Sequence, residues 1–230
     1  MTYVLATSRQ WNEVLAERLQ EKTSQAFHLI TRNKDLTIEL LRSLNPRYVF
    51  FPHWSHIIPK EIHEAFECVI FHMTDLPYGR GGSPLQNLIL RGHNETQICA
   101  LRCVAELDAG PVYTRRPLSL EGSASEIFLR ATHQVQDMIE EIFRTNPTPE
   151  PQEGEPVLFR RRTPAESNLC EANLSTLVDF FDFIRMLDAE GYPKAFIDLN
   201  EHRLELSNVQ MEQDKLVGTF EINPKTREEP

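Results

Sequence analysis

The 230-residue chain contains no long apolar run and only four cysteines. No stretch approaches the ~20 consecutive apolar residues that a membrane-spanning helix needs. The N-terminal segment MTYVLATSRQW lacks the basic region and the apolar core of a signal peptide. The cysteines form no CxxC motif, and no histidine stands at zinc-ligand spacing from them. These absences predict a cytoplasmic protein with free thiols, no metal site and no contact with a membrane.

Positive charge is also scarce. The chain has 24 Lys and Arg residues against 34 Asp and Glu residues, which gives a formal net charge of −10. A surface with this charge repels phosphate polymers. The only basic cluster, Arg160-Arg161-Arg162, is short and is interpreted as a solvated or loop-anchoring run. We therefore expect no nucleic-acid partner.

Strand-like and helix-like segments alternate along the first part of the chain. Short apolar runs typical of strands occur at residues 3–7, 26–30, 48–51 and 68–71, and segments with helical features occur at 12–19, 36–44, 60–66 and 83–91. Repeated alternation of this kind is typical of a parallel sheet with helices on both faces. The predicted fold class is α/β, with a Rossmann-like, mostly parallel sheet.

Residues 96–104 and 111–118 are β-rich, and residues 125–144 carry one apolar helical stripe. The composition changes after residue 145: residues 146–156 (NPTPEPQEGEP) hold four prolines and three glutamates. Further on, a helical stripe around residues 174–187 precedes three strand-like runs. We therefore predict a catalytic domain at residues 1–145, a proline-rich linker or crossing loop at 146–165, and a small C-terminal α+β module at 166–230.

A histidine and an aspartate each follow a strand-like run. His72 comes directly before a loop that contains Pro77 and three glycines, and Asp108 opens the turn Asp-Ala-Gly-Pro. Ligands of parallel sheets collect at the carboxyl ends of the strands, where an imidazole and a carboxylate can perform general acid–base chemistry. Taken alone, each residue also has a simpler interpretation, as a hydrogen-bonded strand-end histidine and as a turn aspartate.

Together, the two motifs resemble those of a known family. The run HMTDLPYGRGGSPLQ, which begins at His72, resembles a segment of the formyltetrahydrofolate-dependent formyltransferases, and Leu107 to Pro111 (LDAGP) is similar to that family's Asp-Thr/Ala-Gly turn. Residues 159–164 and 184–196 look like the start of the small C-terminal domain of its sugar and tRNA members.

The resemblance implies an enzyme, an N-formyltransferase with N10-formyltetrahydrofolate as formyl donor and a primary amine as acceptor. His72 would stabilise the oxyanion or shuttle a proton, and Asp108 would orient the imidazole. The family needs no metal. The family's asparagine two residues before the histidine is replaced by Ile70. Thr74, a backbone N–H or protonated His72 would then have to supply the missing hydrogen-bond donor.

The resemblance also implies two groups of binding residues. The folate is expected between two loops that contain His53, Trp54, Ser55, Cys103, Val104, Glu106 and Leu107. The acceptor is expected against Thr74, Asp75, Tyr78, Gly79, Arg80, Gly81 and Gly82. Two of these residues keep an alternative interpretation: Trp54 as a core or lid aromatic, and Arg80 as an arginine that braces its own loop.

Length and charge, together with the resemblance, indicate the class of acceptor. Because a tRNA acceptor usually demands a basic surface and a longer chain, we expect the sugar N-formyltransferase branch, with a UDP- or dTDP-linked 4-amino sugar as substrate. The loop most resembles the N-formyltransferases of the pseudaminic acid pathway. The alternatives are a non-catalytic relative that binds folate or a sugar nucleotide, and a formyltetrahydrofolate hydrolase. An unrelated nucleotide-binding oxidoreductase is disfavoured, because no glycine fingerprint follows the first strand. A homodimer through the C-terminal strands stays open.

Overall fold

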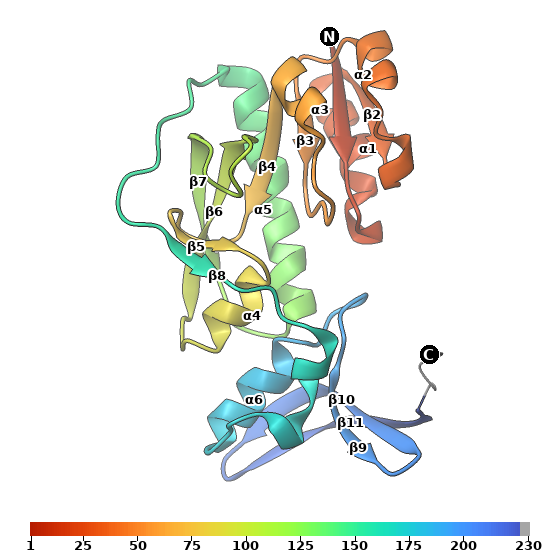
Figure 1. Ribbon diagram of the computed structural model, residues 1–230, viewed down its shortest axis with the longest axis vertical. Coiled ribbons are helices and arrows are strands. Elements are labelled where there is room, and N and C mark those ends of the chain that lie inside the picture. The colour runs from red at the N-terminus through yellow and green to blue at the C-terminus, as the bar shows by residue number, and fades with distance from the viewer. Residues whose placement is uncertain (226–230) are drawn as a thin grey trace. The chain divides into compact units, whose positions relative to one another are not determined.

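The structure, a computed structural model, describes residues 1–225, and the largest sheet in this part of the chain has six strands (Figure 1). The strand order is β2-β1-β3-β4-β6-β7. β1 pairs in parallel with β2 and with β3, β3 pairs in parallel with β4, and β4 pairs antiparallel with β6. The strands are β1 (Thr2–Ala6), β2 (Ala26–Ile30), β3 (Val49–Phe51), β4 (Cys68–His72), β6 (Glu95–Arg102) and β7 (Val112–Ser119). The predicted mostly parallel sheet is confirmed.

Helices cover both faces of this sheet. Side chains of a strand point alternately to opposite faces, so Tyr3 and Val4 mark the two sides of β1. Val4 lies in one buried cluster with Leu41 of α2 (Ile38–Leu44) and Ile62 of α3 (Lys60–Ala65). On the other face, the Tyr3 ring lies 5.4 Å from that of Phe143, which belongs to α5 (Ala124–Thr145). A further helix, α1 (Val14–Thr23), contacts β2. The predicted α/β fold, with helices on both faces of the sheet, is therefore confirmed.

The glycine-rich loop and the proline-rich segment form a small sheet of their own. β5 (Tyr78–Gly81) pairs with β8 (Val157–Phe159), and the Val157 N–H donates to the Pro77 carbonyl at 3.2 Å. Further upstream, Glu150 and Val112 exchange both backbone hydrogen bonds, at 2.7 and 2.9 Å. The segment expected to be a linker or a crossing loop is thus held against the strands. Its prolines lack N–H groups, and all four lie outside the strands, where no donor to a sheet is required.

The chain forms two compact units. The first comprises residues 1–81, 96–118 and 129–158, and the second comprises residues 82–95, 119–128 and, within the described chain, 159–225. The second unit contains α4 (Pro84–Ile89), α6 (Leu177–Arg185) and a three-stranded antiparallel sheet of β9 (Ala195–Leu199), β10 (His202–Glu212) and β11 (Lys215–Pro224). The helix-plus-strand C-terminal module is therefore present. The domain boundaries at 145 and 165 stay a prediction.

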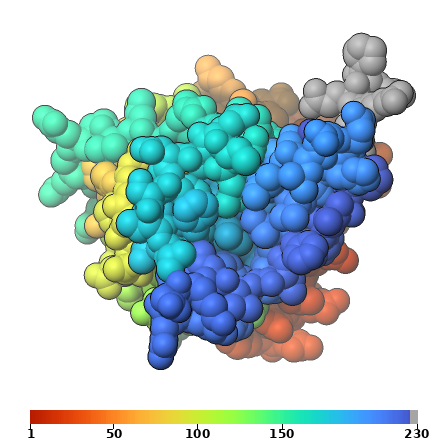
Figure 2. All heavy atoms as spheres, turned by 90° about the horizontal axis from the view of Figure 1, so that it is seen from below, coloured from red at the N-terminus to blue at the C-terminus, as the bar shows by residue number. Residues whose placement is uncertain are grey.

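Short 3₁₀ helices complete the element order, at Gln10–Asn12, Asn33–Asp35, Pro164–Ser167 and Leu169–Glu171. The edge strand β11 contributes to the dark blue surface in Figure 2, and its Phe220 side chain is exposed. Among residues 1–225, no helix is both long and apolar enough to cross a membrane.

Candidate active site

His72 is the last residue of β4, opposite Cys99 of β6, and its side chain is only 9% exposed. The imidazole lies between two acceptors. Its Nε2 is 2.7 Å from the carbonyl oxygen of Gly79, and its Nδ1 is 3.5 Å from Oδ2 of Asp108. A neutral imidazole carries a single N–H. The ring can therefore donate to both neighbours only when both of its nitrogens are protonated.

Asp108 reaches this position through a tight turn between β6 and β7. Its φ is +52°, in the left-handed region that aspartate tolerates better than most residues. A Cβ placed on Gly110 would lie 1.8 Å from the carbonyl oxygen of Arg102, so the turn closes only with glycine there. The buried Asp108 carboxylate accepts a hydrogen bond from the Gly81 N–H at 2.9 Å. The turn thus directs one carboxylate oxygen to both His72 and β5.

The His72–Asp108 pair has the geometry of a proton-handling site. Its 3.5 Å separation is longer than an ordinary hydrogen bond. Catalytic contacts of this kind are commonly loose before substrate binds. Both groups are buried, so their charges interact in surroundings where water screens them weakly. The pair can hold, pass or stabilise one proton next to a bound reactant.

The position that the family fills with asparagine has become apolar. Ile70 is half-buried and packs against two hydrophobic clusters, one that includes Val4 and Phe51 and one that includes Cys99 and Leu101. Of the replacement donors considered from the sequence, the buried Thr74 hydroxyl faces the Gly79 carbonyl at 3.4 Å, and the Gly81 N–H is bound to Asp108. Each of these donors is therefore already engaged inside the protein, as is the Nε2 of His72.

The first loop of the predicted folate site begins with a strained residue. His53 has φ +50°, and its Nδ1 accepts from the Asn12 side chain at 3.0 Å. Burial, with a smaller contribution from Arg9, lowers the pKa of His53 to about 4. Trp54 packs edge-on against Phe51, with ring centroids 5.9 Å apart. Its buried Nε1 has no hydrogen-bond partner within residues 1–225, and the exposed Ser55 donates its N–H to Ser8.

The second loop of the predicted folate site lies mostly at the protein surface. The Cys103 N–H donates to the Cys68 carbonyl at 2.8 Å, and burial raises the pKa of the Cys103 thiol to about 11. Val104 is half-buried, whereas Glu106 and Leu107 are exposed immediately before the buried Asp108. A thiol with this pKa stays protonated near neutral pH, so Cys103 supplies packing rather than a nucleophile.

The predicted acceptor residues do not act as one surface. Gly79 and Gly81 contribute backbone atoms to His72 and Asp108, as described above. Arg80 is only 12% exposed and donates to Gln152 and to Glu106, so the alternative of a loop-bracing arginine describes its contacts. A Cβ on Gly82 would lie 2.4 Å from that of Arg161, so this glycine accommodates the protein's own chain.

Asp75 and Tyr78 lie on the outer side of the same loop. They line an open depression of about 740 Å³, which also includes Arg115, Glu150 and Glu153. His72 and Asp108 do not line it. Two members of the predicted acceptor group are thus set apart from the proton-handling pair. Within residues 1–225, no cluster of histidine, cysteine and carboxylate side chains could hold a metal ion.

Two features near the site were missed from sequence. Gln152, in the proline-rich segment, bonds both Arg80 and the Asp108 turn. Ser83 stands at the N-cap of α4, but with φ +49° and no side-chain cap; its hydroxyl accepts from the Arg162 N–H instead. No local pattern distinguishes either contact, since each joins residues more than 40 positions apart.

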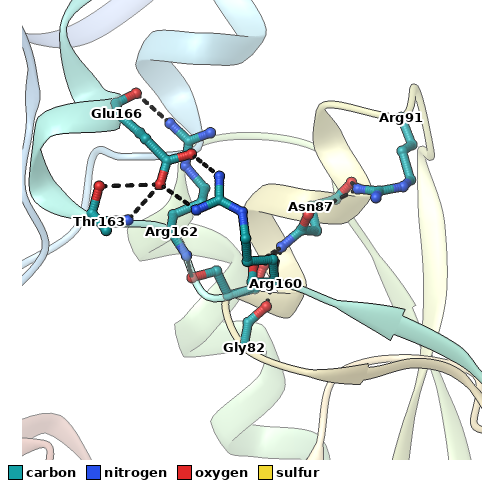
Figure 3. A network of polar contacts seen from close by, with 8 residues as sticks. Gly82, Asn87, Arg91, Arg160, Arg162, Thr163 and Glu166 are labelled. Atoms are coloured by element: carbon teal, nitrogen blue, oxygen red, sulfur yellow. Dashed lines mark hydrogen bonds and ion pairs between the residues drawn. The ribbon is translucent and has the colours of Figure 1, made fainter.

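The arginine cluster anchors a loop, one of its two expected roles. Figure 3 shows Arg160 and Arg162 directed at Glu166, with Asn87 to the right of them, next to Arg91. Arg160 contacts the Glu166 carboxylate at 2.5 and 3.2 Å, and Arg162 donates to the Glu166 carbonyl at 2.5 Å. Asn87 donates to the carbonyls of Gly82, Ser83 and Arg160.

Comparison with known proteins shows which family has this fold. The family model described as "Methionyl-tRNA formyltransferase, C-terminal domain" matches residues 164–223. The solved structure of methionyl-tRNA formyltransferase from Clostridium thermocellum is 44% identical, covers 98% of this chain and 100% of its own, and superposes with a TM-score of 0.94. The methionyl-tRNA formyltransferase of Malacoplasma penetrans is 27% identical over 174 residues, 72% of this chain.

These matches define the chain first as a formyltransferase. The full-length match at 44% identity then sets the group: the chain belongs to the methionyl-tRNA formyltransferase family. It spans 54% of the length of the Malacoplasma penetrans protein and 31% of that of its relative in Rickettsia felis. The expected donor, N10-formyltetrahydrofolate, is the one that formyltransferases of this kind use.

The prediction of the sugar N-formyltransferase branch is wrong. A sugar N-formyltransferase-like structure from Mycobacterium tuberculosis is only 17% identical, at a TM-score of 0.75, and shows the fold alone. The expected nucleotide-linked amino sugar and the exclusion of a nucleic-acid partner are both overturned by the methionyl-tRNA formyltransferase matches. The error came from net charge, which sums over the whole chain and says nothing about where basic groups lie.

Proposed function

We propose that this chain transfers a formyl group from N10-formyltetrahydrofolate to the amino group of methionine carried by a tRNA. The observation that supports this acceptor is the match at 44% identity, over 98% of the chain, to a methionyl-tRNA formyltransferase. The buried His72–Asp108 pair at the end of β4 supports the type of reaction.

Acyl transfer to an amine requires two contributions from the protein. Negative charge that develops on the acyl oxygen needs a hydrogen-bond donor, and the attacking amine must lose a proton. A protonated His72 can donate through either ring nitrogen, and Asp108 can stabilise that protonated ring from 3.5 Å. Because Nε2 already donates to Gly79, contact between this nitrogen and a reactant requires that hydrogen bond to be exchanged.

The residues near strand β3 have a chemistry that suits a folate. Trp54 offers a half-buried aromatic ring, and its indole N–H lacks a partner within the described chain. A half-buried aromatic ring suits stacking against a flat heteroaromatic group. The exposed Leu107, next to Asp108, adds apolar surface at the rim of the second loop. When bound, the folate supplies the formyl group and the nitrogen that leaves.

The test is formation of tetrahydrofolate by the purified chain. Methionine-charged initiator tRNA is the expected acceptor, and the same tRNA without methionine, free methionine and a UDP-linked 4-amino sugar are the controls. Tetrahydrofolate formed only with charged tRNA, together with formylated methionine on that tRNA, would support the proposal. Formate release without any acceptor would identify a hydrolase instead, and no turnover with any acceptor would contradict formyl transfer.

A further inference from the structure

Gln152 lies in the proline-rich segment between α5 and β8, and the structure engages both ends of its amide. Its Oε1 accepts from Nε and Nη2 of Arg80 at 3.1 and 2.9 Å. Its Nε2 donates to the backbone carbonyls of Asp108 and Gly110, both at 2.8 Å. A primary amide has two N–H groups and two acceptor lone pairs. The side chain of Gln152 therefore uses its full capacity for hydrogen bonding in this one place.

The partners of Gln152 flank the two groups that contact His72. Arg80 stands between Gly79, whose carbonyl faces Nε2 of His72, and Gly81, whose N–H binds the Asp108 carboxylate. The carbonyls of Asp108 and Gly110 belong to the turn that carries the carboxylate itself. One amide thus joins the Arg80 side chain of β5 to the turn that carries Asp108. Neither the His72 ring nor the Asp108 carboxylate is a partner in the hydrogen bonds of the Gln152 side chain.

The segment that carries Gln152 is anchored on both sides. Two residues earlier, Glu150 exchanges both backbone hydrogen bonds with Val112, at the start of β7. Five residues later, the Val157 N–H donates to the Pro77 carbonyl. Pro151 directly precedes Gln152, and its ring fixes one backbone dihedral. Little conformational freedom is left at Gln152, so its amide can impose geometry on its partners.

We propose that Gln152 is a positioning residue for the reaction: it holds the Asp108 turn and the β5 strand at the spacing that places Asp108 and Gly79 on opposite sides of the His72 ring. The need for such a residue follows from Asp108 itself. Its left-handed backbone conformation is unfavourable for a residue with a side chain and persists only where surrounding contacts hold it. The catalytic part of this inference rests on the proposed formyl transfer.

Two substitutions separate the two ends of the amide. Gln152→Met keeps the length of the side chain and removes all four hydrogen bonds. Gln152→Glu keeps acceptors for Arg80 but replaces the donors with an oxygen that faces the carbonyls of Asp108 and Gly110. The matched control is Gln20→Glu, at an exposed position of α1, where charge changes and size does not.

We expect Gln152→Met and Gln152→Glu each to lower kcat by about tenfold or more, because a displacement of 1 Å at reacting groups can cost about a hundredfold. The KM for the folate should change by less than about threefold, since Gln152 is not placed in its site. Gln20→Glu should behave as wild type. If Gln152→Glu retains wild-type kcat, then the donors to Asp108 and Gly110 have no positioning role.

A second readout needs no turnover, and so separates this inference from the proposed function. The ¹⁵N chemical shifts of the His72 ring and the hydrogen-exchange rate of the Gly81 N–H are measured in the free protein at one pH. In Gln152→Met, both should move from the wild-type values in the direction seen with Asp108→Asn. Unchanged values in a folded Gln152→Met protein would overturn the proposal, even if the wild type proved inactive with every acceptor.

Discussion

The His72–Asp108 pair and the Arg160–Glu166 pair both join a carboxylate to a basic side chain, but they differ in how fully that carboxylate is satisfied. Glu166 accepts from Arg160, from the Thr163 N–H at 2.7 Å and from the Thr163 hydroxyl at 3.1 Å. These backbone and side-chain hydrogen bonds lower the pKa of Glu166 to about 2, with the Thr163 N–H first among them. Asp108 instead receives one backbone N–H and an imidazole at 3.5 Å.

The difference separates an anchoring group from a reactive one. A carboxylate with every partner at hydrogen-bond distance stabilises one conformation and has no capacity left for a ligand. Asp108 and His72 are more deeply buried than the Arg160–Glu166 pair, yet they are held less tightly to each other. Incomplete satisfaction of buried groups costs stability, and it persists where function requires it.

The largest effect is expected at the incompletely satisfied pair. His72→Ala and Asp108→Asn should each lower formyl transfer by about a hundredfold or more, the scale of a lost acid–base group. Asparagine tolerates the left-handed conformation of Asp108, so the turn should survive. Initial rates of tetrahydrofolate formation and thermal midpoints would be measured for both variants.

Glu166→Gln serves as the matched control for this comparison, since it removes a carboxylate charge from the anchoring pair. It should leave the rate of transfer unchanged. A variant of His72 or Asp108 that unfolds at a much lower temperature than wild type would instead place the pair among the anchoring contacts.

How far the sequence could predict this molecule depends on the range of the interactions. Apolar runs that alternate with helical segments predicted the parallel sheet, because the burial of each strand is visible in its own apolar residues. The order and spacing of the motifs around His72 and Asp108 predicted a pair that the structure does bring together. By contrast, β5 and β8 are four and three residues long, and nothing in their composition indicates that they pair.

The sequence did not predict the formyl acceptor or the contacts of Arg80 with Gln152, and the reasons differ. Net charge averages over the surface, so it led to a wrong exclusion of nucleic acid. Arg80 was expected to bind substrate, but its guanidinium is taken up by Gln152, 72 positions away. Only the folded chain shows which hydrogen-bond partner is within reach of an arginine, since the local sequence does not encode that distance.

Gly82→Ala tests how tightly residues 160–162 are packed against Gly82. The new Cβ would lie 2.4 Å from the Cβ and 2.6 Å from the Cα of Arg161, so backbone must move. Overpacking against backbone costs about 3 kcal/mol, measured as the free energy of unfolding in urea. Gly92→Ala is the control: its φ is +75°, but nothing lies within 4 Å of the added Cβ. If both variants lose equal stability, then packing against Arg161 has no role.

Ile70→Asn asks whether the apolar replacement serves the core or the chemistry. Ile70 packs against both clusters beside the sheet, so an amide there lacks a partner. We expect a loss of about 2 kcal/mol in the free energy of unfolding. Ile70→Val should lose about 1 kcal/mol. A stable Ile70→Asn protein with faster transfer would show instead that the site accepts the family's usual donor and that the core does not require isoleucine.

The smallest effect belongs to the best satisfied carboxylate. Glu166 has a pKa of about 2 in the folded chain, below its ordinary value of 4.5, so its stabilisation is fully present above pH 4.5 and is lost as the pH falls towards 2. Glu166→Gln should therefore lower the free energy of unfolding at pH 6 by about 0.5–1 kcal/mol, a small amount because the pair is largely open to water. Urea unfolding of wild type and variant at pH 6 and pH 2.5 measures this difference. It should shrink at the lower pH, and a difference independent of pH would mean that the hydrogen bonds to Thr163 act without the charge, which would remove the contrast with Asp108.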